Sequence, residues 1–262
     1  MEAPVTLATH EWTPAGPDAP AAPIAMLVHG ITGWWRTWWR VGPALADRGW
    51  RVIAVDLRGH GSSPPMNGAA TAEGLAADLG ATIDALGVPK LDALIGHSLG
   101  AAVVMELAHR RPDVASRLVL EDPPGQTRAD DTEFQDTLER EGRAARTDPE
   151  AEVRRELAEN PNWLAEDARQ NVEGRARADL AGILVSLRAN TGVRPAELAP
   201  DLRLPALYLL ADERRSALGA KRKQLIGSLP AGSEAIEVDS GHTIHRDRFD
   251  DYVAEVLRWV ER

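Results

Sequence analysis

Short, continuously apolar runs that alternate with helical patterns constrain the fold of this chain more than any other feature. Six of these runs have the length of strands: Ile24–His29, Arg51–Asp56, Asp92–Gly96, Arg117–Glu121, Ala206–Leu210 and Ala235–Asp239. Candidate helices lie between them at about residues 36–48, 71–86, 99–111 and 218–228, and an apolar face that includes Phe249 and Val256 predicts a closing helix. Continuous apolar character is typical of strands buried on both faces of a parallel sheet. The sequence therefore predicts an α/β fold with a mostly parallel, doubly wound sheet.

A long interruption follows the fourth predicted strand. The intervening segment is charged and has helical spacing, and at roughly eighty residues it is too long for an unstructured connection. Its helix starts and breaks are marked by Asp148-Pro149, Pro161 and Pro195. We therefore expect a helical lid over residues 123–200, inserted into an α/β core made of residues 1–122 and 201–262.

Composition and motif content exclude several kinds of function. A formal net charge of −10 repels the phosphates of nucleic acids. The 262 residues include no cysteine, so disulfides, thiolate nucleophiles and cysteine-bound metals are excluded. No apolar run approaches the roughly 18 residues of a membrane span, and no phosphate-binding, dinucleotide-binding or zinc-protease motif occurs. We expect a cytoplasmic protein without cofactor or metal, and the oligomeric state stays open.

The strongest chemical signal is Gly96-His97-Ser98-Leu99-Gly100, a G-x-S-x-G sequence that follows an apolar strand and precedes a helical run. Strand, sharp turn and helix are the context that exposes a nucleophilic serine. Side chains at positions 96 and 100 would collide with neighbouring backbone, and the strained turn pushes the serine hydroxyl into the open. Ser98 is therefore the candidate nucleophile, and the positive end of the following helix lies close to any oxyanion formed there.

A nucleophilic serine needs a base, and Ser240-Gly241-His242 supplies a histidine directly after the last predicted strand. A loop at that point overhangs the carboxyl edge of the sheet, where Ser98 is expected. His245 lies three residues further on, near a helix start, and we expect it to make a surface or loop contact. His242 is therefore the candidate general base.

Two further stretches, together with Ser98 and His242 in that order, make the chain resemble the α/β-hydrolase superfamily over nearly its whole length. They are His29-Gly30-Ile31-Thr32-Gly33, similar to the superfamily's His-Gly loop, and Asp56-Leu57-Arg58-Gly59-His60-Gly61-Ser62-Ser63, similar to its D-x-R-G-x-G-x-S turn. The resemblance implies an oxyanion hole formed by the backbone N–H groups of Ile31 and Leu99, which require no particular side chain. A simple turn after a strand would explain the first stretch equally well. We interpret His29, Arg58 and His60 as scaffold.

The acid that would orient the histidine is the least defined member of the set. The superfamily usually places an Asp after the strand that follows the lid, and that position matches Asp212 here, although the glycine that commonly precedes the acid is absent. Asp122, after the preceding strand, is the alternative because some members carry the acid there. Glu213 and Glu121 are neighbouring candidates. We prefer Asp212 over Asp122, and each preserves the chain order serine, acid, histidine.

Tryptophans gather beside the predicted oxyanion loop, where Trp34, Trp35, Trp38 and Trp39 account for four of the eight in the chain. Some of them must share a face, and we expect Trp34 and Trp35 to line the substrate pocket. Packing between this segment and the lid is an equally weighted alternative. Trp163, within the lid, is expected to close the same pocket from above, with packing inside the lid as the alternative.

Together these residues predict a serine hydrolase that cleaves a small or medium hydrophobic ester, thioester or lactone through an acyl-enzyme on Ser98. Serine at this position disfavours dehalogenase-like and epoxide-hydrolase-like chemistry, which uses an aspartate nucleophile. Two alternatives remain. The first is a non-hydrolytic enzyme of the same fold that catalyses carbon–carbon bond cleavage, a lyase reaction or acyl transfer; the second is a small-molecule binding protein with a vestigial site.

Overall fold

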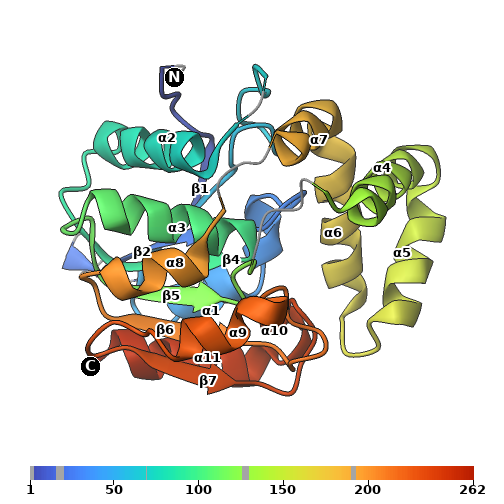
Figure 1. Cartoon of the computed structure of the whole chain (residues 1–262). Coiled ribbons are helices and arrows are strands. Elements are labelled where there is room, and N and C mark those ends of the chain that lie inside the picture. The colour runs from blue at the N-terminus through green and yellow to red at the C-terminus, as the bar shows by residue number, and fades with distance from the viewer. Residues whose placement is uncertain (1–2, 16–20, 69, 126–129, 190–192) are drawn as a thin grey trace.

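The computed structural model describes residues 3–15, 21–68, 70–125, 130–189 and 193–262, and within them the chain forms a seven-stranded sheet (Figure 1). The strands are β1 (Thr9–Trp12), β2 (Ile24–Val28), β3 (Arg51–Val55), β4 (Leu91–His97), β5 (Ala115–Glu121), β6 (Ala206–Leu210) and β7 (Glu234–Glu237). Their order in the sheet is β1-β3-β2-β4-β5-β6-β7; β1 is antiparallel to β3, and the other neighbouring pairs are parallel. The predicted α/β fold with a mostly parallel sheet is confirmed.

The edge strand β1 is absent from the sequence prediction. It is only four residues long, and its side chains alternate between exposed and half-buried positions. Because a continuous apolar run identified the other strands, an alternating edge strand of this length escaped the same criterion.

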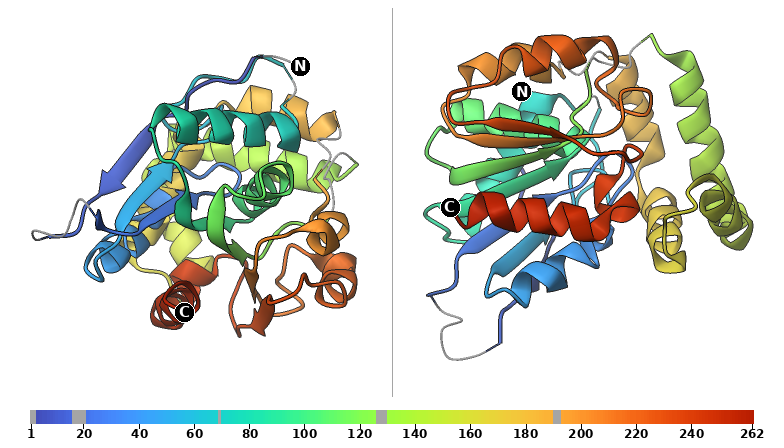
Figure 2. Two further views of the ribbon diagram at one scale, coloured as in Figure 1. Left: turned by 90° about the vertical axis from the view of Figure 1, so that its left-hand side faces the viewer. Right: turned by 90° about the horizontal axis from the view of Figure 1, so that it is seen from below.

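Helices cover both faces of the sheet (Figure 2). On one face α2 (Ala72–Ala85) and α3 (Leu99–Arg110) bury apolar side chains, and on the other face α1 (Val41–Ala46) and α11 (Phe249–Val260) do so around Trp259. Shorter elements follow β6 and β7: a 3-10 turn at Gly219–Lys221, α9 (Arg222–Ile226) and α10 (Ile244–Asp247).

The helix expected over residues 36–48 is divided into a 3-10 turn, Trp35–Trp38, and α1. Pro43 explains the division, because proline has no N–H to donate to the preceding turn of a continuous helix. In the observed structure α1 begins at Val41, so that Pro43 falls in its first turn, where the missing N–H costs nothing.

Helices α4 to α8, called the insertion below, lie between β5 and β6. They are α4 (Thr132–Thr147), α5 (Pro149–Glu159), α6 (Ala165–Arg177), α7 (Leu180–Arg188) and α8 (Pro195–Leu198), followed by a 3-10 turn at Ala199–Asp201. The Asp148 side chain accepts a hydrogen bond from the Ala151 N–H at 3.0 Å and caps α5, and Pro195 begins α8, as the sequence predicts. Helices α4, α5 and α6 stand together beside the sheet (Figure 1). Among the described residues, no helix has the length and apolar character that crossing a bilayer requires.

Candidate active site

Ser98 occupies the sharp turn between β4 and α3. Its backbone φ of 52° lies in the left-handed region, which is rare for a residue with a Cβ atom. The flanking glycines permit this turn. A Cβ atom on Gly96 would lie 2.6 Å from the backbone of Gly100, and one on Gly100 would lie 2.2 Å from the carbonyl oxygen of Val28. The turn therefore depends on glycine at both positions, and it places Ser98 on the wall of a cavity at the carboxyl edge of the sheet.

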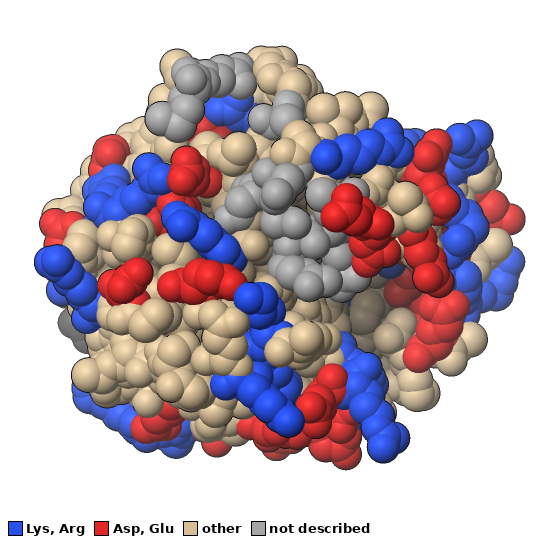
Figure 3. Space-filling view, viewed as in Figure 1, with Lys and Arg blue, Asp and Glu red and all other residues tan. Residues whose placement is uncertain are grey.

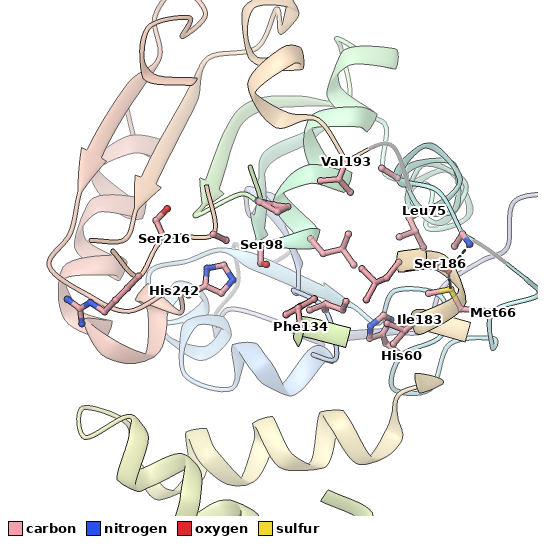
Figure 4. Close-up of a pocket in the computed structure, with 18 residues that line it drawn as sticks. His60, Met66, Leu75, Ser98, Phe134, Ile183, Ser186, Val193, Ser216 and His242 are labelled. Carbon is pink, nitrogen blue, oxygen red and sulfur yellow. Dashed lines mark hydrogen bonds between the residues drawn. The ribbon is translucent and has the colours of Figure 1, made fainter. Parts of the chain in front are cut away.

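His242 lies between β7 and α10 and lines the same cavity as Ser98 (Figure 4). Its Nδ1 atom is 2.6 Å from Oδ2 of Asp122. Asp122 is fully buried, whereas 35% of the His242 side chain is exposed. A short hydrogen bond to a buried carboxylate fixes the orientation of the ring and keeps a proton on Nδ1. Nε2 is then the nitrogen that can accept a proton.

The carboxylate of Asp122 is held by donors from the segment that follows β6. Oδ1 accepts hydrogen bonds from the Ser216 hydroxyl at 2.6 Å and from the Ala211 N–H at 3.3 Å, and Oδ2 accepts one from the Ala217 N–H at 2.8 Å. Asp122 follows β5 directly and has a φ of 39°, so the backbone turns sharply at the end of the strand. These bonds aim Oδ2 at His242.

Asp212, the acid preferred from the sequence, does not lie beside His242. Its side chain is 38% exposed, accepts a hydrogen bond from the Arg214 N–H at 3.0 Å and lies 3.9 Å from Arg215. The structure thus contradicts the expectation for Asp212 and places the alternative, Asp122, against the histidine. The strands β5 and β6 are parallel neighbours that end at the same edge, so spacing along the chain could not decide between their acids.

Ile31 and Leu99 adjoin Ser98 with backbone N–H groups that have no acceptor among the described residues. Ile31 lies in the turn after β2, which is closed by a hydrogen bond from the Gly33 N–H to the Gly30 carbonyl at 3.0 Å. Leu99 begins α3, and the first N–H groups of a helix lack partners within it. Both residues line the cavity at Ser98, where two N–H donors could stabilise an oxyanion.

Two buried histidines hold the loops around this turn. Nε2 of His60 accepts a hydrogen bond from the Thr32 N–H at 3.1 Å, and Nε2 of His29 accepts one from the Leu57 N–H at 3.0 Å. In each ring Nδ1 faces a backbone carbonyl, so each imidazole is neutral with its proton on Nδ1. Burial lowers the pKa of His29 to about 4 and that of His60 to about 3. Their contacts are those of scaffold residues.

The tryptophans are placed differently from the expectation. Trp34 is buried, and its Nε1 donates a hydrogen bond to the Gln170 carbonyl of α6 at 3.0 Å, while Trp35 stacks on His10 with ring centroids 3.7 Å apart. Among the described residues, neither lines the two cavities that reach Ser98, so the structure does not bring Trp34 and Trp35 to the site, and their contact with substrate stays a prediction. The alternative, packing against the insertion, holds for Trp34, which bonds to Gln170 and lies against Gly174 of α6.

Comparison with known proteins shows the family of this chain. A family model described as the alpha/beta hydrolase fold matches residues 23–245. This chain belongs to the α/β-hydrolase fold family. The matched region of this α/β hydrolase includes Ser98, Asp122 and His242.

Individual relatives share part of the sequence or the whole fold. The α/β hydrolase is 39% identical over 109 residues to an sn-1-specific diacylglycerol lipase of Mus musculus, covering 40% of this chain and 34% of the relative. It is 36% identical over 99 residues to epoxide hydrolase 3 of Siraitia grosvenorii, covering 37% and 31%. The chain thus spans about a third of the length of these relatives. The enol-lactonase from Burkholderia xenovorans LB400 has the same fold, with a TM-score of 0.75 at 21% identity over 98% of this chain and 97% of that chain.

The apolar cavity of this α/β hydrolase has a volume of about 330 Å³ and extends from Ser98 toward α2 and α7 (Figure 4). Ser98 and His242 lie at one end, and Met66, Leu75 and Ser186 lie at the other. Most of its lining is apolar: Ile31, Met66, Ala70, Ala72, Leu75, Leu99, Pro124, Phe134, Ile183, Leu187, Val193 and Ala217. Sequence reasoning did not identify the lining residues of the insertion, because an apolar residue on an amphipathic helix carries no sign of whether its face packs on protein or borders a cavity.

The polar cavity, with a volume of about 320 Å³, also reaches Ser98 and His242 and extends between α4, α5 and α6. Its polar lining comprises Thr32, Thr137, Glu141, Glu156, Glu159, Asn160, Asn171, Arg175, Thr243 and Asp247. Trp163 lines it as well, and its Nε1 donates a hydrogen bond to Oδ1 of Asp247 at 2.9 Å. Trp163 is therefore next to the site, although in a different cavity from the apolar one that the sequence suggested.

A buried pair beneath His242 was not foreseen. His245, expected at the surface, is only 2% exposed, and its Nδ1 lies 2.8 Å from Oε2 of Glu121. Nε2 of the buried His97 lies 3.2 Å from the carbonyl oxygen of His242. Burial raises the pKa of Glu121 and lowers the pKa values of His97 and His245. These groups fix the backbone around His242. Spacing along the sequence could not reveal them, because Glu121 at the end of β5 meets His245 only in the folded chain.

Glu141, Glu152 and Glu156 form the one group in the described part of the chain whose side-chain oxygens lie close enough, within 4.8 Å, to hold a metal ion together. Arg155 contacts Glu152 and Arg175 contacts Glu156, each at 2.5 Å. Two guanidinium groups thus already bind these carboxylates, and a metal ion would have to compete with them.

Proposed function

We propose that this α/β hydrolase is a serine hydrolase that cleaves a small or medium hydrophobic ester, thioester or lactone through an acyl-enzyme on Ser98. The observation that carries the proposal is the 2.6 Å contact between Nδ1 of His242 and Oδ2 of buried Asp122, with Ser98 on the same cavity wall. A serine, a histidine oriented by a carboxylate and free N–H donors are the groups that acyl transfer requires.

The mechanism follows from the placement of these groups. Oγ of Ser98 attacks the substrate carbonyl carbon while Nε2 of His242 takes its proton, and Asp122 stabilises the imidazolium that forms. The N–H groups of Ile31 and Leu99 stabilise the tetrahedral oxyanion. His242 then gives its proton to the leaving group. In the second half, His242 removes a proton from water, which attacks the acyl carbon and releases Ser98.

The apolar cavity supports a hydrophobic acyl group, because its walls offer few partners for charge. Phe134 of α4 and Ile183 of α7 both belong to the insertion, so the insertion supplies one side of the acyl site. We propose that it acts as the lid of the enzyme. The enol-lactonase and the diacylglycerol lipase named above act on carboxylic esters according to their names, which fits this substrate class.

Active-site labelling with a fluorophosphonate probe tests the proposal directly. We expect an adduct on Ser98, with turnover of p-nitrophenyl esters lost in Ser98→Ala apart from the residual catalysis, about 10³–10⁴ over water, that binding and the oxyanion hole provide. Ser228→Ala is the matched control, because the Ser228 hydroxyl bonds to the Gln224 carbonyl on α9 and lies in neither cavity. No adduct together with no Ser98-dependent turnover would point to a lyase or a binding protein instead.

A further inference from the structure

Two cavities of unlike chemistry meet at Ser98 and His242 in the described part of the molecule. We infer that they sort the two halves of the substrate: the apolar cavity takes the acyl chain, and the polar cavity binds a polar leaving group that carries no negative charge. The inference rests on the proposed function and adds to it the chemistry of the leaving group.

The walls of the polar cavity offer hydrogen-bonding groups on several sides. Thr137 comes from α4, Glu159 ends α5, and Asn171 comes from α6, while Thr243 follows the catalytic histidine. Such a ring of side chains would leave polar atoms poorly satisfied around an apolar ligand. A leaving group with polar atoms of its own is therefore the matching occupant.

The charge of these walls determines the sign that a ligand can carry. Three glutamates of these walls, Glu141, Glu156 and Glu159, form one ion-paired cluster with the neighbouring Glu152, which does not line the cavity. Among the described residues, ion pairs join these four carboxylates to two guanidinium groups, those of Arg155 and Arg175, so the cluster retains negative charge. Asp247 adds another carboxylate whose hydrogen-bond partners, the N–H groups of Gly241 and Trp163, are neutral. Arg246, whose guanidinium lies 4.6 Å from the centre of the Trp163 ring, offsets one of these charges.

Acidic side chains also gather on the insertion beside a hollow between the insertion and the core (Figure 3). The net negative potential of the walls repels an anionic group and attracts a cationic one.

The route of the second nucleophile identifies the polar cavity as the leaving-group side. Acylation forms the Ser98–acyl ester and breaks the bond to the alcohol, whose oxygen receives the Ser98 proton through His242. Deacylation reverses this path: water attacks the acyl carbon from the place that the alcohol left, and its proton returns through His242 to Ser98. Water occupies polar cavities and leaves apolar ones dry. The alcohol and the water therefore share the polar cavity, and the acyl chain lies in the other.

Three hexanoate esters of equal linker length test the inference. Their alcohols are choline, 3,3-dimethylbutanol and 2-hydroxyethanesulfonate, which place a positive, a neutral and a negative tetrahedral head two carbons from the ester oxygen. We expect kcat/KM to fall in that order, with the choline ester at least about 10-fold above the sulfonate ester at low ionic strength. The ratio should shrink as salt is added, because salt screens these charges.

A pair of charge reversals separates the cavity from the charge of the whole protein. Glu159 and Glu173 are both partly exposed and both pair with an arginine one helical turn away, at 2.6 Å and 2.8 Å, but only Glu159 lines the cavity. Glu159→Lys should lower the ratio of choline to sulfonate ester turnover about fivefold or more, while Glu173→Lys, with the same change in net charge, leaves it unchanged.

Two results would overturn the inference: a sulfonate ester that is cleaved as fast as the choline ester, or an equal fall of the ratio in both lysine variants. The failure of the proposed function is distinct, because in that case Ser98→Ala would cleave all three esters as the wild type does. If turnover depends on Ser98 but is equal for the three alcohols, this inference is refuted while the proposed function stands.

Discussion

Asp122→Asn is the substitution that separates the two candidate acids most sharply. The side-chain amide keeps the shape of the carboxylate but has only one oxygen. With that oxygen in the place of Oδ2, the hydrogen bonds to His242 at 2.6 Å and from the Ala217 N–H at 2.8 Å are retained. The NH₂ group then meets the Ser216 hydroxyl, which can rotate and accept, and only the long 3.3 Å contact from the Ala211 N–H is lost. The variant should fold and keep the proton on Nδ1, while it lacks the negative charge.

The expected loss of rate comes from that missing charge. Asp122 is fully buried and His242 becomes positive only while it carries the Ser98 proton, so the attraction acts in the transition state. Two unit charges about 4 Å apart at an effective dielectric constant of about 20 attract by about 4 kcal/mol, which corresponds to about 10³-fold in kcat. If the amide turned its NH₂ group to His242 instead, the wrong tautomer would form and the loss would approach about 10⁴-fold.

The assay compares kcat and KM for p-nitrophenyl butyrate in the wild type, Asp122→Asn and Asp212→Asn, with near-UV circular dichroism as the check on folding. Asp212→Asn is the matched control, since its 38% exposed side chain accepts a hydrogen bond from the Arg214 N–H that asparagine can also accept. We expect kcat to fall about 10³-fold for Asp122→Asn with little change in KM, and to stay near wild type for Asp212→Asn. The opposite pattern, or a folded Asp122→Asn with nearly normal kcat, would refute the reasoning.

Three further predictions concern stability and the insertion. Lowering the pH from 7 to 5 should reduce the free energy of unfolding by about 2 kcal/mol for each of His29 and His60. The pKa values of these buried rings in the folded chain are about 4 and about 3, so they stay neutral at pH 5, whereas the same histidines in the unfolded chain take up protons near pH 6.5. Stability is thus lost as the pH falls through 6.5, and urea titrations that show no change would contradict this. Gly100→Ala should lower the free energy of unfolding by about 3 kcal/mol or more, because its Cβ would lie 2.2 Å from a main-chain oxygen of β2; a thermal melt like that of the wild type would disagree. Trp163→Phe keeps an aromatic ring but removes the N–H that donates a hydrogen bond to Asp247, which is worth roughly 1 kcal/mol. We expect kcat/KM to fall severalfold. Unchanged kinetics would show that this hydrogen bond does not affect the site.

Local patterns in the sequence predicted the buried parts of the fold well. The strands with continuous apolar runs were predicted because a strand buried on both faces consists mostly of apolar residues. The sharp turn at Ser98 was predicted because it demands glycine on both sides. His242 followed from its place after the last strand. The short edge strand β1 and the division of the helix before Val41 were missed, since neither produces a periodic apolar pattern.

The parts that failed depend on contacts between distant segments. Asp212 and Asp122 end neighbouring strands, and only the sharp turn at Asp122 and its donors near Ser216 decide which carboxylate meets His242. The positions of Trp34 and His245 depend likewise on partners more than a hundred residues away, Gln170 and Glu121. Such partners leave no trace in local spacing.

The two oxygens of Asp247 serve different parts of the molecule: one accepts from the Gly241 N–H, directly before His242, and the other from Nε1 of Trp163 in the insertion. A single carboxylate thus bridges the insertion and the loop that carries His242. The insertion is consequently not an interchangeable module. A chimera that carries a relative's insertion on this core would need a hydrogen-bond donor in the place of Trp163. Without that donor, Asp247 and the loop that carries His242 would lose one hydrogen bond that holds them.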